Sequence, residues 1–247
     1  MKRILAALTL PRLVAVIACL AIFVMAVRAP LDTDMWWHLR AGQWQVESRT
    51  VLCVDMFSHT RAGEAWINHS WLSQVIIYGM YATLGDLGLA LYTALLATAG
   101  MILVYRQMVG GPFVKAFTLI LAGATAAVFW SPRPQMASFF LSTVVLYLLW
   151  LYRVQGVDRL WFVPVIMALW ANLHGGFAIG FILMLLAVLG EGVSWFIDGI
   201  LERGAGSGIE LAERPTLRPV LRLVVIGLVS AAAVSLNPYG PSMLLYP

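Results

Sequence analysis

The residue types best suited to chemistry in this sequence are two carboxylates one residue apart, Asp32 and Asp34, followed by His38. Such a group could bind a divalent cation, Mg²⁺ or Mn²⁺, through its carboxylate oxygens, or supply a general base. A structural alternative is that one aspartate caps a helix beginning near Met35. Hard cations also need further oxygen ligands, which this pattern does not specify. The pattern marks Asp32 and Asp34 as candidate catalytic and metal-binding residues, and His38 as a candidate substrate-binding residue.

Later polar clusters hold further groups that could bind a substrate. Arg133 lies between two prolines and offers a fixed cation for a phosphate or diphosphate, unless it only anchors a helix end by snorkelling. His174 follows Asn172 and precedes two glycines, so it could bind a ligand or belong to a tight helix break. The segment 237–240 is typical of a helix exit followed by a turn. Arg133, Asn172 and His174 are therefore candidate substrate-binding residues.

Composition shows that the elements carrying these residues must be membrane helices. Of the 247 residues, 61% are hydrophobic and 11% are charged, and the mean hydropathy is +0.86. Soluble domains carry roughly 25% charged residues, so a soluble fold is excluded and an all-α, polytopic membrane helix bundle is predicted. The net charge of +4 comes from basic residues that flank apolar runs, which favours membrane topology and argues against nucleic acid as a partner.

Charge placement decides which apolar runs cross the bilayer. After a first run ending at Arg28, the runs cover 69–85, 87–105, 113–130, 135–152, 160–172, 176–199 and 220–236. If 69–85 lies at the outer surface, 11 of the 16 Lys and Arg fall inside, as the positive-inside rule requires; if it crosses, the rule is inverted. We therefore predict seven spans in a single domain, 1–247, with a cytoplasmic N-terminus. An outer loop over 29–86 contains surface helices, and a cytoplasmic linker covers 200–219.

This topology brings the polar clusters to one face of the membrane. They lie in four separate connections, at 32–38, 131–135, 172–176 and 237–240. A short interfacial helix in the first outer loop is predicted from three tryptophans, Trp36, Trp37 and Trp44. Asn68-His69-Ser70 on the same side matches an N-glycosylation acceptor pattern. The convergence of the clusters on the outer face is the main functional signal in the sequence.

The layout resembles the GT-C superfamily of membrane glycosyltransferases, which includes protein mannosyltransferases and lipid-A aminoarabinose transferases. Asp32 or Asp34 matches the acidic residue after the first span in that family, and 68–85 matches its juxtamembrane helix. Similarity to the second outer loop of the family rests on Val128–Arg133, Met136, Phe139 and Phe140. The resemblance covers most of the chain and implies the seven-span N-terminal module of such an enzyme.

What the resemblance implies is sugar transfer from a polyprenyl-phosphate donor at the outer face of a bacterial inner membrane. Asp32 or Asp34 would then act as general base, with a divalent cation as cofactor. Arg133 and His174 would hold the lipid phosphate. The expected partners are the lipid-linked sugar donor, membrane lipids and another membrane subunit.

Two departures from the family pattern support a different hypothesis. Gln135 and Met136 follow the arginine at the place where members often carry a second acid, and the chain ends at Pro247 where members usually continue. The alternative is a non-catalytic membrane subunit or lipid-binding scaffold derived from the same module. A transporter is the third hypothesis, and it depends on Glu191, which lies well inside an apolar run.

Overall fold

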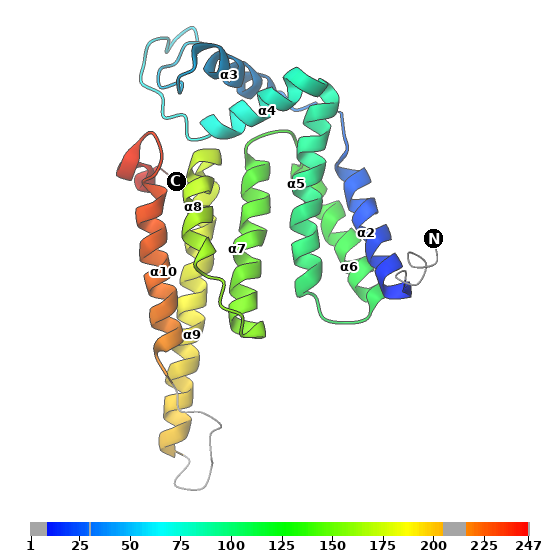
Figure 1. Ribbon diagram of the computed structural model, residues 1–247, viewed down its shortest axis with the longest axis vertical. Coiled ribbons are helices and arrows are strands. Elements are labelled where there is room, and N and C mark those ends of the chain that lie inside the picture. Colours follow the sequence, from blue (N-terminus) through cyan, green and yellow to red (C-terminus); the bar gives the residue numbers. More distant parts are fainter. Residues whose placement is uncertain (1–8, 30, 205–215, 247) are drawn as a thin grey trace.

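The computed structural model describes residues 9–29, 31–204 and 216–246, and the chain is largely helical over these ranges (Figure 1). The β-type pairing found among them is one isolated antiparallel bridge between Val54 and Ala65. The predicted all-α fold is confirmed, whereas most of the predicted linker over 200–219 lies outside the described residues. The elements are α2 (Leu10–Ala26), α3 (Met35–Ser48), α4 (Trp71–Leu84), α5 (Asp86–Gln107), α6 (Pro112–Ala126), η1 (Ala127–Phe129), α7 (Gln135–Gln155), α8 (Phe162–Leu173), η2 (Gly175–Phe177), α9 (Ala178–Gly204), α10 (Arg218–Val234) and η4 (Gly240–Leu245).

Four segments in the described part of the chain are long and apolar enough to span a membrane. They are α5, α6 together with η1, α7, and η2 together with most of α9. α2 and α8 are also apolar but have only 17 and 12 residues. At about 1.5 Å per residue, α8 extends about 18 Å, less than the hydrocarbon core of about 30 Å. The architecture is that of a helical membrane protein with four candidate spans, and the count of seven spans stays a prediction.

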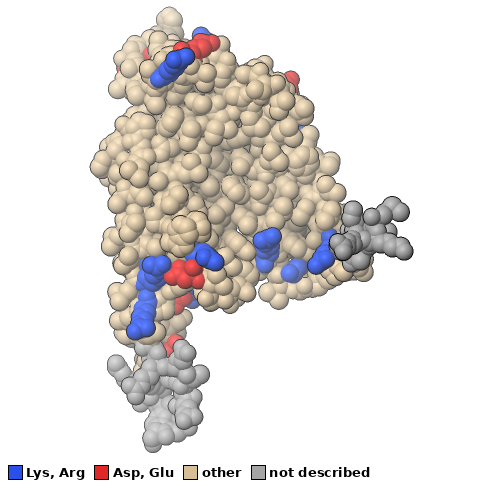
Figure 2. Space-filling view, viewed as in Figure 1, with Lys and Arg blue, Asp and Glu red and all other residues tan. Residues whose placement is uncertain are grey.

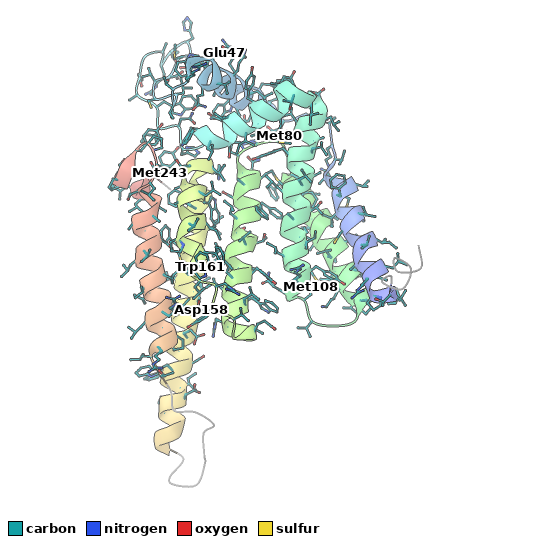
Figure 3. The ribbon with its side chains drawn as sticks, viewed as in Figure 1. Glu47, Met80, Met108, Asp158, Trp161 and Met243 are labelled. Carbon is teal, nitrogen blue, oxygen red and sulfur yellow. The ribbon has the colours of Figure 1, made fainter. Side chains whose placement is uncertain are left out.

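The upright helices alternate in direction, so that their connections gather at two ends of the bundle (Figure 1). One end carries α3 and α4 and is called the α3–α4 end below. Figure 2 shows Lys and Arg gathered toward the opposite end, where Arg106 lies in the last turn of α5 and Arg153 in the last turn of α7. In Figure 3, Met80 marks the α3–α4 end and Met108 the opposite end. Basic residues that the sequence analysis assigned to one side therefore do lie together.

α3 and α4 lie across their end of the bundle rather than along it (Figure 1). α4 corresponds to the run assigned to the membrane surface, and it is not among the candidate spans. The two helices meet at Gly42, where an added Cβ would collide with the backbone carbonyl of Gln74. α4 also joins the end of α8, because the hydroxyl of Ser73 donates to the carbonyl of Leu173 at 2.7 Å. α4 thus connects α3 to the upright helices.

Two apolar clusters form the core of the bundle. One contains buried residues of α2 to α7, and the other contains buried residues of α7 to α10 around Trp170, which is fully buried. The first cluster includes small side chains of α2 and α5, among them Ala18, Ala94 and Ala97. Small residues let helix backbones approach closely, which is the usual way that membrane helices pack. This packing fixes the end of α2, from which the chain enters the first loop.

Candidate functional site

An ion-paired trio of residues joins the first loop to the turn between α6 and α7. Arg133 Nη1 lies 3.1 Å from Asp32 Oδ2, and Arg133 Nη2 lies 3.0 Å from Asp34 Oδ2. One guanidinium therefore bridges both carboxylates of the Asp-Thr-Asp segment, about a hundred residues away in the sequence. We call Asp32, Asp34 and Arg133 the carboxylate–arginine trio. It lies at the α3–α4 end.

Short turns ahead of two helices hold the trio in place. Asp34 occupies the N-cap position of α3, but its side chain makes no capping hydrogen bond and pairs with Arg133 instead. The backbone N–H of Asp34 donates to Asp32 Oδ1 at 3.0 Å. On the other side, the N–H of Arg133 donates to the carbonyl of Ser131 at 2.7 Å, in the turn before α7. The capping alternative is therefore not the role that Asp34 has in this structure.

The charges of the trio compensate one another in part. Burial raises the pKa of Asp32, but hydrogen bonds from Ser131, from Arg133 and from the backbone of Asp34 outweigh it, so the pKa is lower than usual. The guanidinium lies on both carboxylates, in the place of a cation that they would share. Within the described residues, no group of three or more His, Cys, Asp and Glu has an arrangement that could hold a metal ion. In this arrangement both carboxylates are paired with Arg133, and a divalent cation shared by them stays a prediction.

His38 belongs to a buried amide network between α3, α4 and the connection before α4. Gln74 Oε1 accepts hydrogen bonds from Gln45 Nε2 at 2.9 Å and from Asn68 Nδ2 at 2.8 Å. Gln74 Nε2 lies 3.3 Å from His38 Nδ1. Because an amide nitrogen only donates, His38 Nδ1 accepts and the imidazole is neutral, with its proton on Nε2. Burial and the positive charge of Arg133 lower the pKa of His38 to about 3, in agreement with that state.

His174 lies where α8 ends, and a chain of hydrogen bonds fixes its ring. Trp170 Nε1 donates to Ser138 Oγ at 2.7 Å, and that hydroxyl lies 2.8 Å from His174 Nδ1. The N–H of Gly176 also donates to His174 Nδ1, at 3.1 Å. With two donors directed at Nδ1, the proton of this imidazole is on Nε2 as well. Burial, followed by nearby positive charges, lowers the pKa of His174 to about 4.

His69 is a third histidine of the site, and the sequence analysis did not select it. Its ring centroid lies 5.7 Å from that of His174 and 4.6 Å from that of Tyr246. Its Nδ1 is buried and has no hydrogen-bond partner among the described groups. Burial lowers the pKa of His69, and a positive charge on His69 would in turn lower the pKa of His38. The signal that could have found it is its place in the predicted outer loop, just before α4.

Asn172 has a structural position. Its Oδ1 accepts from Trp71 Nε1 at 2.9 Å, and its Nδ2 donates to the carbonyls of Ala168 at 2.8 Å and Leu236 at 2.9 Å. Three parts of the chain, α4, α8 and the end of α10, therefore meet at this amide. Since both of its amide atoms are engaged within the protein, we interpret Asn172 as a residue that holds helices together.

The turn after α10 reaches back to the first loop. Tyr239 accepts a hydrogen bond from the N–H of Asn68 at its hydroxyl, with a distance of 2.7 Å. The Asn68 side chain is 1% exposed and donates to Gln74. A glycosylation enzyme could not reach this amide in the folded protein, so the acceptor pattern at Asn68 is not a modification site of this fold.

A cavity of about 470 Å³ opens beside Asp32, between the end of α2, α5 and the turn before α7. Residues on its wall include Arg28, Leu31, Asp32, Val128, Trp130 and Ser131. Leu31 and Val128 are largely exposed, so the cavity has an apolar rim. The indole Nε1 of Trp130 and the Nε of Arg133 are both buried without hydrogen-bond partners among the described groups. Trp130 lines the cavity, whereas Arg133 is not part of its wall, and both atoms can only donate.

Comparisons with known proteins do not place the chain in a family. No protein-family model, no curated protein and no solved structure matches it.

Proposed function

We propose that this membrane protein transfers a sugar from a polyprenyl-phosphate donor to an acceptor hydroxyl at the α3–α4 end. The observation that carries the proposal is the carboxylate–arginine trio, whose Asp32 also lines a cavity with an apolar rim. A phosphate supplies acceptor oxygens and a charge that a guanidinium binds well. The resemblance to GT-C glycosyltransferases supports the same assignment.

The two carboxylates differ in exposure, which suggests a division of roles. The side chain of Asp34 is 52% exposed, whereas that of Asp32 is 22% exposed. Asp34 is therefore the carboxylate that an acceptor hydroxyl reaches more easily, and we assign it as the general base. Asp32 keeps Arg133 in place when the anionic donor binds. A donor phosphate competes with Asp34 for the guanidinium, which frees Asp34 to accept a proton.

In the transfer step, the acceptor oxygen forms a bond to the anomeric carbon while the bond from that carbon to the phosphate oxygen breaks. The hydroxyl proton passes to Asp34, and the electron pair leaves with the polyprenyl phosphate. Arg133, whose side chain is 31% exposed, holds the charge that develops on the phosphate. His38 and His174 are both neutral and add no positive charge to the site. No step requires a metal ion.

The cavity also suits the lipid character of the donor. Its rim has exposed apolar side chains, Leu31 and Val128, at the level where α2 and η1 end. Arg28 lies on the wall, and its Nη1 donates to the carbonyl of Ala127 at 3.0 Å. A polyprenyl chain could remain among the helix ends while its phosphate reaches the trio. In this proposal, the reacting group lies at the edge of the apolar region.

The test is transfer of radiolabelled sugar from polyprenyl-phosphate-linked hexoses by the purified full chain in lipid nanodiscs, with a membrane extract as acceptor. We expect Asp34→Asn to lower turnover at least about a hundredfold, because the proton acceptor is lost. Arg133→Gln should raise KM for the donor. The matched control is Asp158→Asn. Asp158 lies away from this site and forms an ion pair of 3.0 Å with Arg222. Equal turnover in Asp34→Asn, Asp32→Asn and the unaltered chain refutes the assignment.

One observation favours the alternative of a non-catalytic scaffold. The three charged groups of the trio satisfy one another and tie the first loop to the turn before α7, as a structural clamp would. In that case, removing the trio lowers stability and the chain transfers no sugar, either alone or with a co-purified membrane subunit.

The transport hypothesis depends on Glu191. Its Oε1 lies 2.5 Å from Arg153 Nε, so this carboxylate is part of an ion pair.

A further inference from the structure

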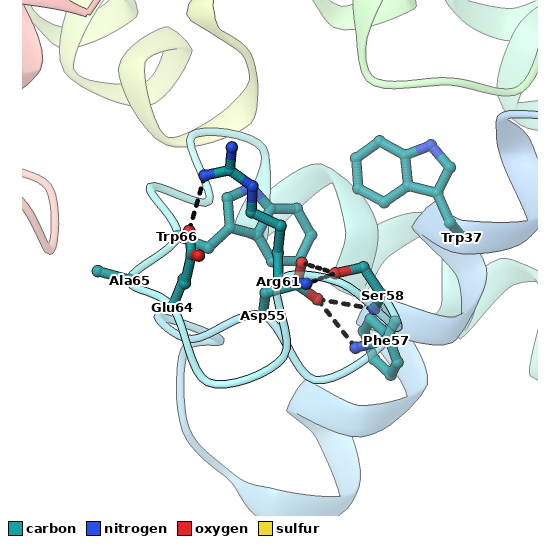
Figure 4. A pocket seen from close by; sticks show the side chains of 8 residues that line it. All are labelled: Trp37, Asp55, Phe57, Ser58, Arg61, Glu64, Ala65 and Trp66. Carbon is teal, nitrogen blue, oxygen red and sulfur yellow. Dashed lines mark hydrogen bonds and ion pairs between the residues drawn. The ribbon is translucent and has the colours of Figure 1, made fainter.

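A second cavity lies in the first loop, and we propose that it binds the acceptor as a neutral saccharide. It has a volume of about 630 Å³, within the range of small-molecule sites, and is formed by Trp37 of α3 and by the segment 55–66 (Figure 4). The inference rests on the proposed function and names the substrate class of its acceptor side. Its observations are separate from those of the carboxylate–arginine trio.

Aromatic rings provide the walls of the cavity. Trp37, Phe57 and Trp66 all line it, and the ring centroids of the two tryptophans are 5.6 Å apart. Trp37 and Phe57 are 39% and 40% exposed, so their faces are open to a ligand. A pyranose ring has one face of C–H groups and an edge of hydroxyls. The C–H face packs on an indole, as other flat apolar groups do.

Charged groups at the rim can bind the hydroxyl edge. Arg61 Nη1 and Glu64 Oε2 form an ion pair of 2.8 Å, and their side chains are 71% and 55% exposed (Figure 4). The guanidinium has further N–H donors, and the carboxylate has a second acceptor oxygen. Donors and acceptors side by side are what a row of sugar hydroxyls requires.

The charges of the cavity favour a neutral ligand over a cationic one. Aromatic cages also bind quaternary ammonium groups, and an unpaired carboxylate beside the rings would strengthen that binding. Here Glu64 is neutralised by Arg61. Asp55 uses Oδ1 for the N–H groups of Phe57 and Ser58, at 2.9 Å each, and Oδ2 for the Ser58 hydroxyl. These hydrogen bonds lower the pKa of Asp55 and leave it committed to the loop.

The loop that carries the cavity has a fixed shape. The backbone N–H of Trp66 donates to the Cys53 carbonyl at 2.8 Å, and the backbone N–H of Asp55 donates to the Glu64 carbonyl at 2.9 Å. The carbonyl of Asp55 accepts a hydrogen bond from the N–H of Gly63. The φ of Gly63 is 91°, a backbone conformation that glycine adopts without steric cost. A prearranged loop loses little conformational entropy when a ligand binds.

The cavity is connected to the proposed catalytic groups through α3. The rings of Trp37 and His38 have centroids 3.6 Å apart and planes tilted by 33°, and Asp34 lies one helical turn before Trp37 in the sequence. A saccharide on Trp37 thus lies on the same short helix as the proposed general base. Its hydroxyl would be the oxygen that attacks the anomeric carbon of the donor, with its proton passing to Asp34.

The test uses saturation-transfer difference NMR on the full chain in nanodiscs. The probes are the methyl glycosides of glucose, mannose, galactose and N-acetylglucosamine, with tetramethylammonium as the competing class. We expect transfer to the C–H ring protons of at least one glycoside, and binding about tenfold weaker in Trp37→Ala. Arg61→Ala, at an exposed rim position, should also weaken binding without affecting the fold. The control is Trp161→Ala, because Trp161 is 52% exposed at the start of α8, away from the cavity.

Three results overturn the inference: no glycoside binds, binding is equal in Trp37→Ala, Arg61→Ala and the unaltered chain, or tetramethylammonium binds at Trp37 and the glycosides do not. Glycoside binding without any sugar transfer would leave the acceptor cavity standing and refute the proposed function. Sugar transfer that is unchanged in Trp37→Ala and Arg61→Ala would support the proposed function and refute the acceptor cavity.

Discussion

Gln74 is the residue whose replacement tests the buried amide network most directly. Its side chain accepts from Gln45 and Asn68 and lies against His38 Nδ1, and it is fully buried. Gln74→Leu keeps a similar volume, removes one of the two hydrogen bonds that Gln45 Nε2 and Asn68 Nδ2 each donate, and leaves His38 Nδ1 without its donor. One buried unsatisfied acceptor costs about 1–3 kcal/mol and each lost hydrogen bond about 1 kcal/mol, so the free energy of unfolding should fall by about 3–5 kcal/mol.

The measurement is denaturant unfolding of the full chain in micelles, followed by circular dichroism and by pulse proteolysis of the first loop. Gln43→Leu is the matched control, because Gln43 lies on the same α3–α4 pair but forms exposed hydrogen bonds with Arg40 and Glu47. It should change the free energy of unfolding by less than about 0.5 kcal/mol. A change of similar size in both variants would show that the network does not hold α3 on α4.

Three further predictions concern the same end of the molecule. Gly42→Ala should lower the free energy of unfolding by about 1–3 kcal/mol, because the added Cβ meets the Gln74 carbonyl. Gly79→Ala has open space around the added Cβ and should be neutral or stabilising. Thermal denaturation measures both variants. Arg133→Lys should lower it by about 1 kcal/mol, because one ammonium cannot bridge both carboxylates, and a double-mutant cycle with Asp32→Asn measures the coupling. Since the folded-state pKa of His38 is about 3, below its unfolded value near 6.5, its contribution to stability is present above pH 6.5 and is lost as the pH falls. The His38 share of the free energy of unfolding should therefore decrease by about 2 kcal/mol between pH 7.5 and 5, in addition to the shares of His174 and His69, and the total decrease should be smaller in His38→Gln; an unchanged pH slope in that variant would contradict a buried neutral imidazole.

Much of the helix layout follows from the sequence, because apolar periodicity and flanking charges report directly on the surroundings of a membrane helix. The run at 69–85 forms α4, and the turn with Arg133 meets Asp32 and Asp34 as the convergence of outer turns predicted. The number of spans is less accessible. α8 has only 12 helical residues, and sequence windows do not show where a helix ends within an apolar run.

The polar partners within the site could not be predicted in the same way. Gln45, Asn68 and Gln74 are ordinary polar residues of a loop and two helices until α3 crosses α4. The pairing of Asp34 with Arg133 instead of the α3 backbone depends on a contact between distant turns. Such pairings arise from tertiary geometry, and single-sequence patterns carry only the residue types that take part.

The hydrogen bond from Asn68 to the Tyr239 hydroxyl has a consequence for the order of assembly. It joins residues 171 positions apart, so it can form only after all the intervening helices have been synthesised and inserted. The first loop is synthesised early, but its hydrogen bond to Tyr239 forms only when the turn after α10 has been made. During biogenesis, the loop that carries Asp34 and Trp37 therefore lacks this contact until the turn after α10 has docked.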